Sequence, residues 1–146
     1  MWRVPSGGGA AQQITRQGGF ESAESLDGAW LYYNKFGYNT VGLFRQVLPS
    51  GREELAVPLL QLTSLGGWSI DANGIYFIHR YDDIATPAKH PAIRFFDFRT
   101  RRIRDVAPLR DPGQDPGLNI VDDGRAAIFS RAASVDHDVM LIRNYH

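Results

Sequence analysis

The chain has 146 residues, enough for one domain with a hydrophobic core, and its 43% hydrophobic and 12% aromatic content argues against disorder. Lys and Arg number 16 and so do Asp and Glu, so the zero formal charge predicts no direct nucleic-acid binding and no attraction to an anionic membrane. Because cysteine is absent, disulfides and thiolate zinc sites are excluded.

Short alternating apolar runs between turn residues predict a series of β-strands, and no stretch shows convincing helical periodicity. The expected leading hairpin has strands at 2–4 and 12–15. Two four-stranded units follow, with strands expected at 20–25, 29–34, 41–48 and 53–59, then at 65–70, 74–79, 92–98 and 103–109. The last unit has strands expected at 118–121, 125–131 and 139–145. Residues 80–91, with two prolines and two adjacent aspartates, predict a long loop.

One unit recurs three times: an aspartate and a glycine in a turn between two strands. The turn residues are Asp27 with Gly28, Asp71 with Gly74, and Asp123 with Gly124. We predict a structural role for them, because Gly tolerates positive φ and a short carboxylate accepts hydrogen bonds from turn amides. The aspartates are 44 (71 − 27) and 52 (123 − 71) positions apart, and a period of roughly 40–50 residues with several short strands is typical of a β-propeller.

The sequence therefore predicts an all-β fold, a partial β-propeller of about three four-stranded antiparallel blades plus a leading hairpin. Residues 1–17 would end one blade, 18–60 and 65–109 would each form a blade, and 117–146 would form a last, incomplete blade. Closed propellers have roughly 4–8 blades, so we expect further blades upstream or self-association to complete the ring. No signal peptide follows Met1 and no run reaches the length of a membrane span, so we expect the chain to begin inside a structural unit and not to insert into a membrane.

Three patterns point weakly to chemistry, and each has an ordinary structural explanation. The glycine-rich residues 6–9 lack the Gly-Lys-Ser/Thr of a phosphate-binding loop, and residues 67–71 lack the final glycine of the Gly-x-Ser-x-Gly hydrolase turn. The His and Asp residues of 79–90 and 136–138 do not have a metal-ligand spacing. We therefore predict that the chain is not an enzyme, with no catalytic, cofactor-binding or metal-binding residues and no cofactor.

The basic cluster of the chain lies at an expected hairpin and consists of Arg99, Arg101, Arg102 and Arg104. A solvated turn is favoured over a phosphate site, because zero net charge gives no wider basic surface. The aromatic residues are expected to pack between blades, and three of them follow the turns at corresponding positions: Tyr33, Phe77 and Phe129.

The turn units resemble the TolB-like, WD-type propeller repeats of bacteria, in which Ser-Pro-Asp-Gly precedes an apolar strand. Residues 25–28 read Ser-Leu-Asp-Gly, and 69–72 and 121–124 fit more loosely. A narrower resemblance is to the C-terminal propeller of bacterial regulators that carry an N-terminal winged-helix DNA-binding domain. The segments that carry it are 43–47, 67–69, 74–78, 95–98 and 134–145.

The narrower resemblance implies a non-catalytic binding or sensing module, the C-terminal part of a cytoplasmic winged-helix transcriptional regulator, with a protein or small-molecule partner. The winged helix, which this sequence lacks, would contact the DNA, and the C-terminus would be native. Two alternatives stay open. One is the propeller of a prolyl-oligopeptidase-like peptidase, and the other is a periplasmic TolB-like scaffold that binds envelope proteins.

Overall fold

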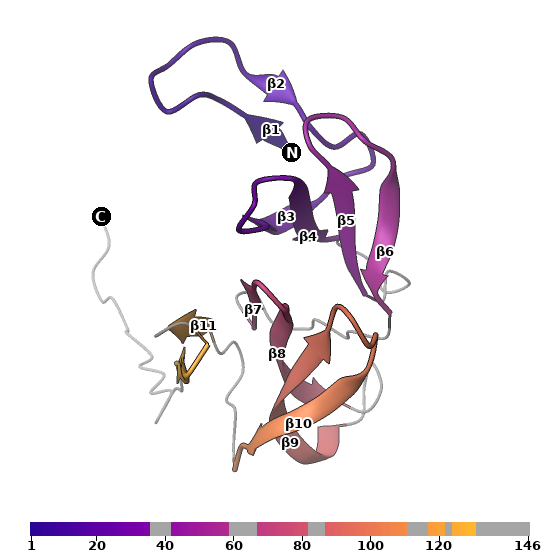
Figure 1. The fold of residues 1–146 in the computed structure, drawn as a ribbon, viewed down its shortest axis with the longest axis vertical. Helices are drawn as coiled ribbons and strands as arrows, with labels where there is room; N and C mark the ends of the chain where they lie inside the picture. Colours follow the sequence, from indigo (N-terminus) through magenta and orange to yellow (C-terminus); the bar gives the residue numbers. More distant parts are fainter. Residues whose placement is uncertain (36–41, 59–66, 82–86, 111–116, 122–123, 131–146) are drawn as a thin grey trace, which may run out of the picture.

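A computed structural model of the chain describes residues 1–35, 42–58, 67–81, 87–110, 117–121 and 124–130. Every regular element among these residues is a β-strand, which confirms the all-β prediction (Figure 1). No helix in this part of the chain is long and apolar enough to cross a membrane. The strand predicted at 139–145 lies outside the described residues.

The strands form two short hairpins and two four-stranded sheets. The leading hairpin consists of β1 (Trp2–Arg3) and β2 (Gln12–Gln13). The first sheet contains β3 (Phe20–Glu24), β4 (Trp30–Asn34), β5 (Leu43–Val47) and β6 (Glu53–Val57). The second sheet contains β7 (Trp68–Asp71), β8 (Gly74–Tyr81), β9 (Pro87–Asp97) and β10 (Ile103–Pro108). The trailing hairpin consists of β11 (Leu118–Val121) and β12 (Ala126–Phe129).

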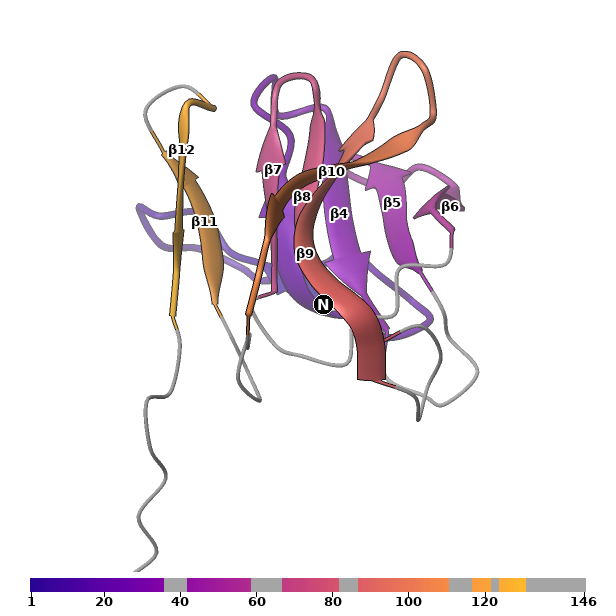
Figure 2. The ribbon, with the colours of Figure 1, turned by 90° about the horizontal axis from the view of Figure 1, so that it is seen from below.

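Each strand of a sheet pairs antiparallel with the next strand along the chain, as in a propeller blade. The sheets and hairpins follow one another along an arc, with β3, β7 and β11 toward its concave side (Figure 1). Hydrogen bonds join these inner strands in succession. Trp68 Nε1 donates to Glu21 Oε2 at 3.3 Å, and the Ile120 amide donates to Ser69 Oγ at 3.2 Å. The two sheets are therefore consecutive blades, and Figure 2, seen from below, shows the second sheet in front of the first.

The largest hydrophobic core lies between the two sheets. It is formed by Tyr32, Leu43, Ala56, Val57, Trp68, Ile75, Phe77 and Phe96. Side chains alternate along a strand, so Leu31 and Tyr33, the neighbours of Tyr32 on β4, pack instead against Ile14 beside the leading hairpin. Both faces of the first sheet are thus covered by apolar contacts, as expected of a sheet inside a stack of blades.

The loop predicted at 80–91 is shorter in the structure, because strand pairing extends into it from both sides. β8 continues to Tyr81 and β9 begins at Pro87, with Tyr81 opposite Pro87. A register shift between His79 and Tyr81 accommodates the irregularity, and prolines are tolerated at such bulges. The prediction treated the prolines as loop residues and missed this extension.

The trailing hairpin packs on the second sheet by one face only. Leu118 is buried in a cluster with Ile78, Ile93 and Leu109. The prediction that Tyr33, Phe77 and Phe129 fill equivalent core positions holds for the first two, which are 0% and 5% exposed, but Phe129 is 40% exposed. Phe129 lies on β12, whereas β11 is the strand of this hairpin that lies against β7 and β8 of the second sheet.

Candidate binding surfaces

The turn at Asp27 is held by the hydrogen bonds that the sequence pattern predicts for a short carboxylate. Asp27 Oδ1 accepts from the Ser25 hydroxyl at 2.5 Å and from the Ala29 amide at 3.0 Å. These bonds stabilise the ionised form, so the Ser25 hydroxyl first and the Ala29 amide second lower the pKa of Asp27. Gly28 has a φ of 70°, which favours glycine. The carboxylate is engaged within its own turn.

The turn between β7 and β8 uses its glycine differently. Asp71 Oδ1 accepts from the Asn73 amide at 3.1 Å, much as Asp27 does in its turn. Gly74, however, does not have positive φ: a Cβ built there would lie 2.1 Å from the Phe96 carbonyl oxygen. Gly124 has a φ of 84° and lies beside the Asp71 carboxylate. Asp123 lies outside the described residues.

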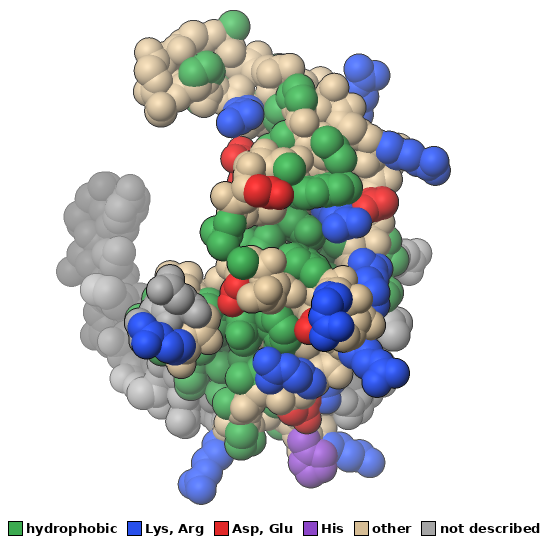
Figure 3. Space-filling model, viewed as in Figure 1, with side chains coloured by type: hydrophobic (Ala, Val, Ile, Leu, Met, Phe, Trp, Pro, Cys, Tyr) green, Lys and Arg blue, Asp and Glu red, His purple; other side chains and the backbone are tan. Residues whose placement is uncertain are grey.

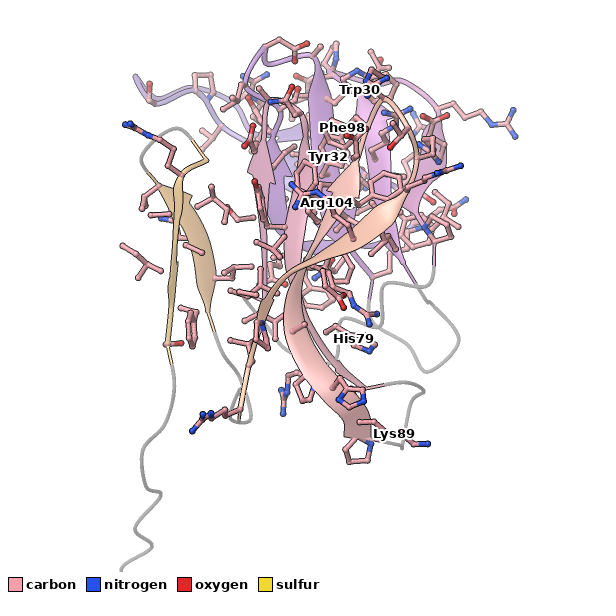
Figure 4. All side chains as sticks on the ribbon, turned by 60° about the horizontal axis from the view of Figure 1, so that its bottom comes forward. Trp30, Tyr32, His79, Lys89, Phe98 and Arg104 are labelled. Carbon is pink, nitrogen blue, oxygen red and sulfur yellow. The ribbon has the colours of Figure 1, made fainter. Side chains whose placement is uncertain are left out.

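The sequence analysis also considered the His and Asp residues of 79–90 and 136–138 as metal ligands. No group of three or more His, Asp or Glu side chains is placed to hold a metal in the described ranges. His79 and Lys89 lie at the end of the second sheet opposite its β7–β8 and β9–β10 turns (Figure 4). Residues 82–83 and 136–138 lie outside the description.

A polar contact that the sequence did not predict joins the two sheets. At a bulge in β3, Glu21 has a φ of 45° and its Oε2 accepts from Asn34 Nδ2 at 2.6 Å and from Trp68 Nε1 at 3.3 Å. Burial raises the pKa of Glu21, against the opposing effect of these two hydrogen bonds. A non-glycine residue at positive φ has no recognisable sequence pattern, so only the structure reveals this contact.

Arginine side chains lie over aromatic rings at the turn end of the sheets, and we call this region the turn face. Arg45 lies 4.1 Å from the ring centre of Trp30, Arg104 lies 4.9 Å from that of Phe95, and Arg101 lies 5.2 Å from that of Phe96. Figure 4 shows Trp30, Tyr32, Phe98 and Arg104 close together near this end, and Figure 3 shows Lys and Arg side chains over β9 and β10. Arg101 and Arg104 remain solvent-exposed, as a solvated turn predicts, but the rings beneath hold them in place.

A cavity of about 170 Å³ lies between the leading hairpin and the first sheet. Its apolar lining includes Met1, Ile14, Leu31 and Leu48, and Ser22 and Glu24 of β3 form its polar side. Arg3 lies 3.7 Å from Glu24 across this space. The cavity therefore lies on the side of the first sheet away from the second.

Comparison with known proteins identifies the fold. No protein-family model matches the chain, and no curated protein matches it in sequence. The crystal structure of TolB from Acinetobacter baumannii is similar, with a TM-score of 0.66 and 20% sequence identity. The match covers 88% of this chain and 31% of the TolB chain, so this chain spans less than a third of that protein. The resemblance to winged-helix regulators stays a prediction, whereas the fold is that of a TolB-like β-propeller segment.

Proposed function

We propose that the chain is a non-catalytic propeller segment that acts as a protein-binding scaffold. The turn face is the observation that carries this proposal. It presents Trp30 beside arginines held on aromatic rings, and Trp, Tyr, Phe and Arg are the residues enriched at protein interfaces. Arginines already positioned on rings lose less conformational freedom when a partner binds, which favours binding at this face.

The TolB-like fold supports the same function, since the sequence resemblance to TolB-like repeats implies a scaffold that binds envelope proteins. A TolB-like scaffold would be periplasmic, whereas a winged-helix regulator would be cytoplasmic. Fractionation of cells that produce the full-length protein distinguishes the two. A serine-reactive fluorophosphonate probe tests the non-catalytic assignment, and labelling of the protein would contradict it.

Site-specific photo-crosslinking tests the binding face directly. A photoreactive amino acid replaces Arg102, an exposed residue between β9 and β10 next to Arg101 of the turn face, in one variant. In a control it replaces Lys89 at the opposite end of the second sheet (Figure 4). We expect the first variant to form a discrete crosslinked band with one protein, and the control not to form it. The double substitution Arg101→Ala and Arg104→Ala should weaken that band. Equal crosslinking from both positions, or none from either, would overturn the proposal.

A further inference from the structure

A row of stacked side chains crosses from the first sheet to the second at the turn face, with an arginine at each end. On the first sheet, Arg45 lies 4.1 Å from the ring centre of Trp30, and its Nη1 donates to the Tyr32 hydroxyl at 3.4 Å. Tyr32 stacks on Phe98, which follows β9 of the second sheet, with ring centres 5.7 Å apart. Figure 4 shows Trp30, Tyr32 and Phe98 close together. The row therefore holds side chains of both sheets in fixed relative positions.

The two arginines of this row differ in how their charge is matched. Arg45 is paired with Glu54, whose Oε1 accepts from Arg45 Nε at 2.6 Å. At the other end, Phe98 lies edge-on to Phe96, and Arg101 lies 5.2 Å from the Phe96 ring centre. Within the described part of the chain, no carboxylate lies within ion-pair distance of Arg101. A guanidinium that rests its flat surface on a ring can still donate two parallel hydrogen bonds from its edge to a carboxylate.

The backbone of Arg101 has a conformation that is unfavourable for arginine. Its φ is 58°, in the left-handed region that non-glycine residues adopt rarely and at a cost. Glycine or asparagine adopts this turn conformation more easily. Residues held in such conformations are concentrated at functional sites. A contact made by the side chain therefore explains the arginine better than the geometry of the turn does.

Two exposed apolar side chains flank the row. Val47 pairs with Trp30, so it points toward the second sheet, and it is 41% exposed. Ile103 pairs with Phe96, so it points toward the first sheet, and it is 44% exposed. The inter-sheet strip, as we call this part of the turn face, consists of Trp30, Arg45, Val47, Phe98, Arg101 and Ile103. It combines apolar area with one unmatched positive charge, and it lies wholly within the described residues.

We propose, building on the function proposed above for the turn face, that the inter-sheet strip binds an acidic segment of the partner protein. This segment is a short stretch of chain in which an Asp or Glu side chain lies next to an apolar one. Its carboxylate pairs with the edge of Arg101, and its apolar neighbour packs on Val47 and Ile103. Because the apolar contact excludes water from the ion pair, the two interactions strengthen each other.

The distribution of charge favours an acidic peptide over a nucleic acid. Carboxylates lie beside other arginines of the two sheets: Glu54 pairs with Arg45, and Asp105 Oδ1 lies 2.8 Å from Arg94 Nε. The whole chain has a formal charge of zero. A DNA duplex carries one phosphate charge per ~1.7 Å and would repel these carboxylates, whereas a peptide can place a single carboxylate opposite Arg101.

Selection from a random dodecapeptide library displayed on phage tests the preference, with the full chain as the target. We expect the selected peptides to be enriched in Asp or Glu next to an apolar residue. Enrichment of basic or uncharged peptides, or no enrichment at all, would overturn the proposal. The most enriched peptide, labelled with a rhodamine dye, is then used to measure affinity by fluorescence anisotropy.

Arg101→Gly separates binding from folding, since glycine suits the positive φ of this position. The variant should keep a Tm close to that of the wild type by circular dichroism. Its affinity for the peptide should fall roughly tenfold or more, because a charge-assisted hydrogen bond is lost. Arg52→Gln is the matched control: it removes the same charge from an exposed position in the β5–β6 turn, outside the strip, and should bind like the wild type. Unchanged affinity of Arg101→Gly, or an equal loss in both variants, would contradict a specific contact with Arg101.

Two comparisons separate this inference from its rivals. A labelled single-stranded oligonucleotide that binds more tightly than the peptide, and loses this binding in Arg101→Gly, would identify the ligand as a nucleic acid and overturn the acidic peptide. A crosslinked partner band at Arg102 without an acidic preference in the library would leave the protein-binding function standing and remove this inference alone. Absence of the band would instead remove the proposed function itself.

Discussion

At the start of β8, the backbone of Gly74 lies so close to β9 that a side chain has no room. A Cβ at Gly74 would be 2.1 Å from the Phe96 carbonyl oxygen and 2.5 Å from Cζ of Phe95. Both neighbours belong to the paired strand β9, so neither moves without disturbing the second sheet. The glycine that the sequence analysis assigned to turn flexibility is required instead by this close approach of two strands.

Gly74→Ala should therefore lower the free energy of unfolding by about 1–3 kcal/mol, the usual range for overpacking. Chemical denaturation monitored by tryptophan fluorescence measures the change. Gly7→Ala is the matched control, because no atom lies within 4 Å of its would-be Cβ and its φ is not positive. If both variants unfold at the same denaturant concentration as the wild type, β8 and β9 can move apart at Gly74 without loss of stability, and the prediction is wrong.

The Glu21 carboxyl gives the inter-sheet contact a pH dependence. Burial raises its pKa above the ordinary value of 4.5, so the folded state holds the proton more tightly than the unfolded state. The stability that Glu21 contributes is therefore present below the unfolded pKa and falls as the pH rises through the folded pKa.

Glu21→Gln, which does not titrate, should flatten the decline of Tm between about pH 4 and pH 7, the range above the pKa of a free glutamate. Asp97→Asn is a control for which we expect the opposite dependence of stability on pH. The Thr100 amide lowers the pKa of Asp97, so its contribution is present above the unfolded pKa and is lost as the pH falls. The Asn variant should lose stability relative to the wild type at neutral pH. If the Tm of the wild type and that of Glu21→Gln change with pH in parallel, the Glu21 carboxyl does not cause the decline.

Among the elements, three neighbouring strands of the first sheet are joined by one side chain. Arg45 of β5 lies over the Trp30 ring of β4, and its Nη2 lies 2.5 Å from a carboxylate oxygen of Glu54 on β6. The guanidinium suits this position because its flat surface stacks on the ring while its edge donates to the carboxylate. Lysine offers no such flat, forked group.

Arg45→Ala should lower the free energy of unfolding by about 1 kcal/mol, since exposed cation–π contacts and surface ion pairs are each worth roughly 0.5–1 kcal/mol at most. Arg45→Lys should recover only part of the loss. Arg52→Ala, an exposed arginine in the nearby β5–β6 turn, should cause little change. Thermal denaturation of the three variants in low and high salt separates the ion pair, which salt weakens, from the ring contact.

How far the sequence predicts these elements depends on the kind of interaction. The strands of the two sheets follow from their alternation, and the turns follow from Asp27 and Asp71, because both signals are local. The bulge at Glu21, the extension of β9 to Pro87 and the exposure of Phe129 depend on which strand lies alongside. A single sequence does not show which strands are neighbours. For the same reason, the arginine–aromatic contacts of the turn face could not be predicted from it.

For the molecule as a whole, the pairing of each strand with its neighbour in sequence determines how the chain acquires its structure. Both sheets form from contiguous stretches, β3 to β6 and β7 to β10, so their folding requires only the closure of short loops. Such blades can assemble one after another during synthesis on the ribosome. The formation of each sheet is therefore a unimolecular process, whose rate does not change when the protein is diluted.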